Sequence, residues 1–153
     1  MGRDTIFKVL AGMAIAGTVI VLPGTAQAAP YQCKDKQDCF FKELDSKGTV
    51  SVQARLIPDS GKFVGWIDDF RNSHYTDGSS LQDSVSSVVN NTDRWIIIYD
   101  EGHRHGIRTV VGPHSTANLN YVWAYDEEGP IGRRNMDNVA TSAEVVTSCN
   151  VCY

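Results

Sequence analysis

Residues 79–106, SSLQDSVSSVVNNTDRWIIIYDEGHRHG, contain the clearest fold signals of this chain. A serine-rich turn lies at 82–87, a second turn at 90–93, and a strongly apolar run extends from Trp95 to Tyr99. β-Branched and aromatic side chains pack well on a pleated surface, and the run is too short for an ordinary helix. Because Asn and Gly punctuate both sides of the run, the centre of the chain is predicted to alternate between turns and strands.

Strand-like segments of similar length lie on both sides of this stretch. Turn signals separate them, among them the Pro-Asp-Ser-Gly of residues 58–61 and the Gly-Pro of residues 112–113. Short strands at this spacing are typical of an all-β sandwich or barrel. The expected strands cover residues 49–57, 62–67, 85–89, 94–99, 107–111, 119–125 and 139–146.

One segment has a helical pattern instead. Over Asp35–Leu44, Asp38 is a suitable N-cap, and Phe40, Phe41 and Leu44 share one face of a helix. The pattern predicts one short helix at the N-terminal end of the domain.

Residues 1–28 have the features of a secretory signal peptide. Arg3 and Lys8 give a positive start, residues 9–22 are uncharged and mostly apolar, and Ala26-Gln27-Ala28 has the small-x-small pattern of a cleavage site. The apolar run is shorter than the ~20 residues that span a bilayer. We therefore expect secretion without a membrane anchor.

Residues 29–153 have a length that suits a single domain with its own hydrophobic core. The whole chain has a formal net charge of −4. An acidic surface argues against nucleic acid as the partner. The sequence contains no G-x-S-x-G, no H-E-x-x-H and no glycine-rich phosphate loop. We therefore expect an extracellular, monomeric protein that is not an enzyme.

The cysteines of the mature chain lie at its two ends. An even number in an exported protein indicates two disulfides, and three pairings are open. Disulfides between the N-terminal and C-terminal cysteines would link the two ends of the domain, whereas disulfides within each end would constrain only that end. Export and the strand-like sequence before the C-terminal pair argue against a redox motif or a zinc site. The four residues are Cys33, Cys39, Cys149 and Cys152.

An internal repeat relates the two halves of the domain. A bulky-x-Gly corner at 63–65, and another at 104–106, each precede an acidic or amide residue followed by two hydroxyls. The second half is longer, and the extra residues fall around Asn120–Met136. Two copies of one four-stranded unit predict two Greek keys. The repeated motifs are Gln82-Asp83-Ser84-Val85-Ser86-Ser87 and Asp137-Asn138-Val139-Ala140-Thr141-Ser142.

These motifs resemble the paired calcium motif of βγ-crystallin domains, and Phe63-x-Gly65 resembles their aromatic-x-Gly corner. Within that superfamily, residues 84–92, the run 95–99 and the Val-Gly-Pro of 111–113 look most like secreted actinobacterial peptidase inhibitors of peptidase inhibitor family thirty-six. The resemblance covers about residues 50–146. It implies a βγ-crystallin-like sandwich that binds a secreted peptidase, with a metallopeptidase as the expected target.

The resemblance also implies a calcium site between the two motifs. Calcium needs several oxygen ligands at once, and carboxylate, amide and hydroxyl groups of the motifs could supply them. Alternatively, the hydroxyls only fix the turn backbone. Gln82 departs from the usual first Asp or Asn, and Arg104 replaces the aromatic residue of the second corner. The candidate ligands are Asp83, Ser86, Asp137, Asn138 and Thr141.

Two further motifs have plainer interpretations. A metal site at His103-Arg104-His105 would need more ligands, and only His74 and His114 remain, so an exposed polar turn is preferred. Asn90-Asn91-Thr92 fits the N-glycosylation pattern, but a hairpin turn explains it equally well.

An inhibitor presents a rigid surface loop that fills a peptidase cleft. The candidate loop is Asn120–Met136, in which Tyr121, Trp123 and Tyr125 are candidate anchors and Asp126-Glu127-Glu128 offers carboxylates to a metal. Alternatively, these aromatic residues belong to the core of an ordinary strand. The alternative functions are an antimicrobial or killer-toxin-like βγ-crystallin protein that acts at cell envelopes, and a structural calcium-binding extracellular domain.

Overall fold

The computed structural model describes residues 30–56 and 65–149. The predicted signal peptide, the Phe63-Val64 pair of the first predicted corner and Cys152 lie outside these residues. Within the described ranges, no helix has the length and hydropathy needed to cross a bilayer.

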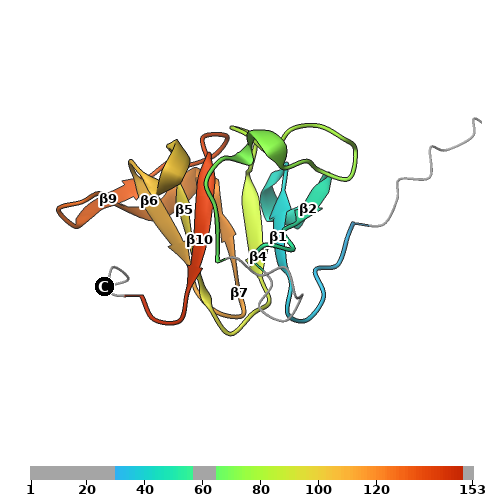
Figure 1. Cartoon of the computed structure of the whole chain (residues 1–153), viewed down its shortest axis with the longest axis horizontal. Coiled ribbons are helices and arrows are strands. Elements are labelled where there is room, and N and C mark those ends of the chain that lie inside the picture. Colours follow the sequence, from blue (N-terminus) through green and yellow to red (C-terminus); the bar gives the residue numbers. More distant parts are fainter. Residues whose placement is uncertain (1–29, 57–64, 150–153) are drawn as a thin grey trace, which may run out of the picture.

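The described chain is all-β and consists of two antiparallel sheets, which lie side by side in Figure 1. Sheet A has the order β2-β1-β4-β7, with β1 (Asp38–Phe41), β2 (Val50–Val52), β4 (Ser87–Asn90) and β7 (Ser115–Asn118). Sheet B has the order β3-β10-β5-β6-β8-β9, with β3 (Trp66–Ile67), β5 (Trp95–Tyr99), β6 (Arg108–Val111), β8 (Val122–Tyr125), β9 (Pro130–Arg134) and β10 (Ser142–Val146). Short 3-10 turns are η1 (Leu44–Ser46), η2 (Phe70–Asn72), η3 (Gly102–Arg104) and η4 (Leu119–Tyr121).

The strand order confirms two Greek keys. The first consists of β1 to β4, and the second consists of β5, β6, β7 and β10. The third strand of each key joins the sheet of the other key: β3 pairs with β10, and β7 pairs with β4. The β8–β9 hairpin is inserted between β7 and β10 and extends sheet B beyond β6.

Two equivalent corners relate the keys, and they correct the predicted repeat. In each key a serine Oγ donates to a corner carbonyl at 2.6 Å and accepts from a corner amide at 3.0 Å. The counterpart of Gly106 is therefore Gly48, not Gly65; both corner glycines have positive φ, +81° and +73°. From corner glycine to motif the two keys have nearly equal lengths, 83 − 48 = 35 and 138 − 106 = 32 residues, so the second half is not longer overall, although the β8–β9 hairpin is inserted where extra residues were predicted. The contacts are Ser87 with Glu43 and Ser46, and Ser142 with Glu101 and Arg104.

The predicted helix over Asp35–Leu44 is wrong, because residues 38–41 form strand β1 in the middle of sheet A. Phe40 and Phe41 point to opposite faces of the strand, as the period of two requires. Phe40 lies in the core between the sheets, edge-on to Phe70 with ring centroids 5.6 Å apart. Phe41 packs with Cys39 in a second, smaller cluster. Both faces of β1 are covered, which explains why its apolar residues do not alternate with polar ones.

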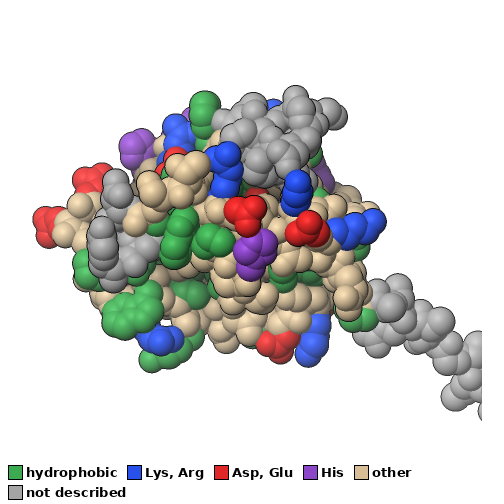
Figure 2. All heavy atoms as spheres, turned by 90° about the horizontal axis from the view of Figure 1, so that it is seen from below, with side chains coloured by type: hydrophobic (Ala, Val, Ile, Leu, Met, Phe, Trp, Pro, Cys, Tyr) green, Lys and Arg blue, Asp and Glu red, His purple; other side chains and the backbone are tan. Residues whose placement is uncertain are grey.

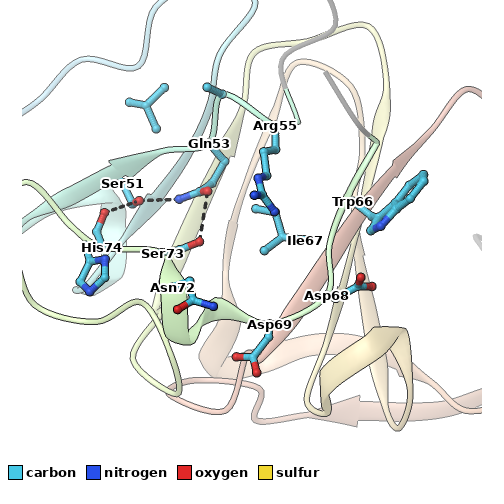
Figure 3. A pocket seen from close by; sticks show the side chains of 12 residues that line it. Ser51, Gln53, Arg55, Trp66, Ile67, Asp68, Asp69, Asn72, Ser73 and His74 are labelled. Atoms are coloured by element: carbon cyan, nitrogen blue, oxygen red, sulfur yellow. Dashed lines mark hydrogen bonds between the residues drawn. The ribbon is translucent and has the colours of Figure 1, made fainter. Parts of the chain in front are cut away.

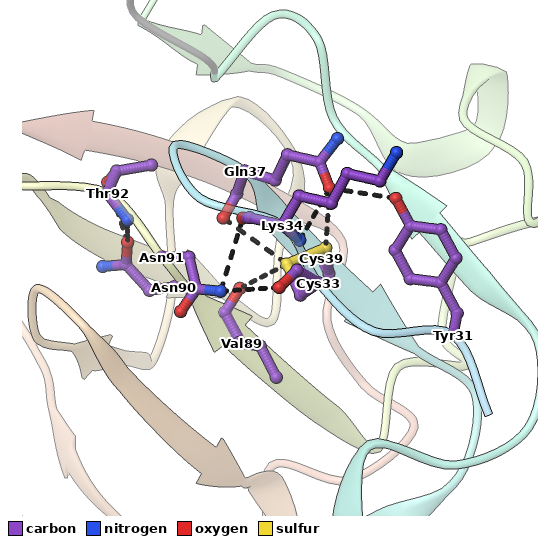
Figure 4. Close-up of a disulfide and its surroundings, with 9 residues drawn as sticks. All are labelled: Tyr31, Cys33, Lys34, Gln37, Cys39, Val89, Asn90, Asn91 and Thr92. Atoms are coloured by element: carbon purple, nitrogen blue, oxygen red, sulfur yellow. Dashed lines mark hydrogen bonds between the residues drawn. A yellow bond between two sulfur atoms is a disulfide. The ribbon is translucent and has the colours of Figure 1, made fainter.

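The disulfide pairing is local at the N-terminal end. Cys33 and Cys39 are bonded to each other, and the Asn91 side chain donates to the Cys33 carbonyl at 2.7 Å, which holds this segment against the end of β4 (Figure 4). Cys149 is also in a disulfide. The pairing at Cys33 excludes a zinc site made from all four cysteines.

Asn90-Asn91-Thr92 begins a turn, as predicted, but not a hairpin turn, because β4 before it lies in sheet A and β5 after it lies in sheet B. Asn90 is fully buried, and its amide donates to three backbone carbonyls, those of Arg94, Val111 and Gly112. Its Oδ1 accepts from the backbone and hydroxyl of Thr92 (Figure 4). A side chain held in this way is not accessible for glycosylation in the folded protein.

Candidate functional site

The segment 120–136 is a short turn followed by a hairpin, not an irregular loop. Strand β8 pairs with β6 on one side and with β9 on the other. The register shifts between Ala124 and Tyr125, as it does at a β-bulge. At the tip, the Asp126 carboxylate accepts from the amides of Glu128 and Gly129 at 2.9 and 3.0 Å. These bonds fix the tip in one turn conformation.

The three candidate aromatic anchors differ in exposure. Tyr121 is 66% exposed and Trp123 is 54% exposed, whereas Tyr125 is 9% exposed. The core interpretation is therefore wrong for the first two residues and right for Tyr125. A half-exposed Trp beside an exposed Tyr is the composition found at the centres of protein interfaces.

A basic side chain that the sequence analysis did not single out completes this surface. The guanidinium of Arg133 on β9 lies over the rings of Tyr121 and Trp123, 4.7 and 5.6 Å from their centroids. The contact follows from the hairpin register, in which Trp123 lies opposite Arg133. We call Tyr121, Trp123 and Arg133 the aromatic–arginine cluster.

The cluster lies beside a groove of about 450 Å³ that is also lined by Trp95, Val110 and Thr116. In Figure 2, hydrophobic side chains gather beside a basic one at the end where Figure 1 places β9, and acidic side chains lie farther out. The three side chains of the cluster thus line the groove, and the hairpin tip lies farther along the same two strands.

The acidic candidates divide into two kinds. Asp126 is half-buried and stabilises the turn. Glu127 and Glu128 are exposed, and neither carboxylate forms a hydrogen bond or ion pair with the rest of the described chain. The hairpin therefore presents free carboxylates at its tip and a cation with aromatic rings near its base.

The two calcium-motif turns lie against each other, and their backbones pair across the repeat. The Asp83 amide donates to the Ala140 carbonyl at 3.1 Å, and the Asn138 amide donates to the Val85 carbonyl at 3.0 Å. Asp83 and Asn138 occupy equivalent positions with positive φ, +49° and +59°. The fold thus brings together the two motifs that the sequence analysis selected.

The oxygen atoms of the two motifs do not fit a cation equally well. The Gln82 amide donates to the Thr141 hydroxyl at 3.1 Å, and this hydroxyl donates to the Asp83 carboxylate at 2.9 Å. Gln82 thus offers a neutral amide at the motif position where Asp137 offers a carboxylate in the second motif. Ser86 donates its hydroxyl to a backbone carbonyl, and the Asp137 Oδ1 and the Gln82 Oε1 are both buried without a hydrogen-bond partner.

The histidine turn offers no metal site. His103 and His105 are exposed on either side of Arg104, as the polar-turn interpretation expects. Over residues 30–56 and 65–149, no group of three or more His, Cys, Asp or Glu side chains could hold a metal ion.

A second hollow of about 670 Å³ lies beside β2, β3 and η2 (Figure 3). Three of its polar side chains are paired with one another: Gln53 donates to Ser51 and accepts from Ser73. At its edge, Trp66 carries the stacked guanidinium of Arg104. We assign no function to this hollow.

Comparisons with known proteins agree with this architecture. The model of peptidase inhibitor family I36 matches residues 26–111, which is more than half of the chain. A solved structure from work on the evolution of the eye lens βγ-crystallin domain fold is similar, with a TM-score of 0.53 and 18% identity, over 78% of this chain and 94% of that chain. At this identity the similarity shows the fold alone. A search of curated proteins gave no match. The family match ends at Val111, before the β8–β9 hairpin.

Proposed function

Because the chain belongs to peptidase inhibitor family I36, we propose that it is a secreted inhibitor of metallopeptidases and that the β8–β9 hairpin is its inhibitory element. The observation that best supports this assignment is the exposed aromatic–arginine cluster. It lies on a hairpin whose acidic tip is held in one conformation by the hydrogen bonds of Asp126. The Cys33–Cys39 disulfide agrees with an oxidising compartment outside the cell.

The hairpin has the properties that cleft-filling requires. Its tip lies about 10 Å along the strand from Trp123, since a strand rises roughly 3.3 Å per residue. An anchor at the base of the hairpin and a carboxylate at its tip can therefore reach different subsites of one cleft. Glu127 or Glu128 would supply an oxygen ligand to a catalytic zinc ion, for which carboxylates are ordinary ligands. A prefolded tip loses little conformational entropy on binding, which favours affinity.

The experiment that tests this function is a titration of a panel of secreted metallopeptidases and serine peptidases with the oxidised mature protein. We expect saturable inhibition of at least one metallopeptidase and none of the serine peptidases. Inhibition confined to serine peptidases would contradict the zinc-ligand role of the tip. Killing of bacterial cells without inhibition of any peptidase would favour the envelope-acting alternative.

We also propose that calcium, if bound, occupies the side of the paired motif that contains Asp137. The buried, unpartnered Oδ1 of this residue supports the assignment, with Ser86 and backbone carbonyls as further oxygen donors. On the other side, the Gln82 amide donates to the Thr141 hydroxyl, and the buried, unpartnered Gln82 Oε1 is a neutral amide oxygen that attracts a cation less than a carboxylate does. Asn138 contributes mainly through its backbone conformation.

Replacing Gln82 with Asp should restore the second calcium position. Extracellular calcium modules bind with dissociation constants of about 10⁻⁴ to 10⁻³ M, so 10 mM calcium should stabilise the variant by about 1–3 kcal/mol through this position. The readout is the melting temperature in calcium and in EDTA. We expect a larger calcium-dependent rise for Gln82→Asp than for the unaltered protein, and a smaller one for Asp137→Ala. Equal rises in all three proteins would contradict this assignment.

A further inference from the structure

The guanidinium of Arg133 is held in place but has no anionic partner. It lies over two aromatic rings, and cation–π contacts of this kind attract the guanidinium to the ring faces. No carboxylate of the described chain lies within ion-pair distance of Arg133, although the hairpin tip has free carboxylates. A guanidinium has five N–H donors that match a carboxylate in two-point geometry.

The same protein contains a completed version of this arrangement. On the other edge of sheet B, the Arg104 guanidinium lies 5.2 Å from the ring centroid of Trp66, a half-exposed tryptophan. There the Arg104 Nη1 pairs with Asp68 Oδ1 at 2.6 Å, and its Nε lies 3.9 Å from Glu144. The two sites share an arginine stacked on an exposed tryptophan. They differ in that the site at Arg133 lacks the carboxylate.

We propose that Arg133 is a specificity-determining residue that binds a carboxylate on the surface of the partner peptidase. The carboxylate lies next to an apolar side chain, which packs on Trp123 and Tyr121. This inference rests on the proposed function, because it names the partner's surface chemistry at the same hairpin. It predicts that the peptidases which the protein inhibits have an acidic rim beside an apolar subsite.

The charge of the molecule makes this site selective. The chain as a whole is acidic, with a formal net charge of −4, so an acidic partner is repelled by most of the surface. The exposed arginines of β9 provide a local attraction that orients the encounter. Arg133 and Arg134 point to opposite faces of the strand, and only Arg133 stacks on the aromatic rings.

The first test compares three variants against a metallopeptidase that the protein inhibits. Arg133→Ala should weaken inhibition by about ten- to a hundredfold, and Arg133→Lys should recover only part of it, because an ammonium lacks the planar fork. Arg134→Ala is the matched control, since it removes the same charge from the same strand, and its effect should stay below about threefold. Equal losses for Arg133→Ala and Arg134→Ala would overturn the proposal in favour of a general charge effect.

The second test does not depend on finding a target. Its probe is the capped peptide acetyl-Glu-Leu-Glu-Leu-Glu-amide, titrated into the isotope-labelled mature protein at low salt. We expect saturable NMR shifts at the Trp123 indole and the Arg133 guanidinium. These shifts should disappear in Arg133→Ala and when the Glu residues of the peptide are replaced with Gln.

Absence of these shifts would overturn the proposal even if peptidases are inhibited. Their presence without any inhibition would refute the inhibitor function and keep the carboxylate site. Tighter saturation by polygalacturonate than by the peptide would overturn the assignment to a protein partner.

Discussion

Replacing Trp123 with alanine should weaken inhibition of the target metallopeptidase by about a hundredfold, or roughly 2.7 kcal/mol of binding free energy. The indole ring is the largest exposed apolar group of the aromatic–arginine cluster, and its loss also removes one of the two rings that orient Arg133. Because the ring is half-exposed, its removal should change the melting temperature little. The measurement is the inhibition constant, with thermal unfolding recorded in parallel.

The chain offers a matched control for this variant. Trp66 is 47% exposed and also carries a stacked arginine, but it lies on the opposite edge of sheet B from the hairpin. Trp66→Ala should leave the inhibition constant within about twofold of the unaltered value. Equal losses for Trp66→Ala and Trp123→Ala would show that the hairpin is not the anchor.

Asp38 should make the fold more stable at pH 5 than at pH 8. It is fully buried at the start of β1, and neither of its carboxylate oxygens has a hydrogen-bond partner in the described chain. Burial raises the pKa of Asp38 from 3.8 to about 7. Since the folded-state pKa lies above the unfolded-state value, the associated stability is present at low pH and is lost as pH rises through about 7. The expected loss between pH 5 and pH 8 is on the order of 2–3 kcal/mol.

Asp38→Asn removes the titration and should abolish this pH dependence. The variant should be more stable than the unaltered protein at pH 8 and of similar stability at pH 5, as measured by denaturant unfolding. Asp35→Asn is the control, because Asp35 is exposed and three residues away in the same segment. A pH dependence that persists in Asp38→Asn would show that another group causes it.

Local composition was enough to predict the strands that lie inside the sandwich. The run Trp95–Tyr99 becomes β5 between β10 and β6, and Ile96 and Ile98 lie in the core. Such a strand can be predicted without knowledge of its partner strands, because successive β-branched residues favour the extended conformation of a strand. The paired motifs were equally informative, since the fold places Asp83 and Asn138 in equivalent strained turns.

The incorrect predictions arose where tertiary contacts determine the structure. The apolar residues around Phe40 fit one helix face as well as two strand faces, and only pairing with β2 and β4 selects the strand. Strand β9 contains a proline, a glycine and two arginines, and it is extended because it pairs with β8. Neither β7 nor β9 has an alternating pattern of its own.

The candidate site was predictable only in part. Tyr121, Trp123 and the acidic tip were recognised from residue type and spacing, but local sequence could not tell exposed Trp123 from buried Tyr125. Arg133 was not selected because its contact with the two rings depends on the register across the hairpin, which no local pattern encodes. A register prediction for residues 122–134 would have placed Arg133 opposite Trp123.

We propose that this peptidase inhibitor binds its target by the β8–β9 hairpin and is not cleaved. This binding mode is tested most directly by a tight-binding titration of one inhibited metallopeptidase, followed by mass analysis of the recovered inhibitor. We expect the peptidase activity to fall linearly to near zero at an equimolar ratio of inhibitor, and the recovered inhibitor to have an intact hairpin. With Trp123→Ala the titration curve should be gradual, without a sharp end-point at this ratio. Cleavage within residues 122–134 with recovery of activity would identify the hairpin as a substrate. A titration unaffected by Trp123→Ala would contradict the hairpin assignment.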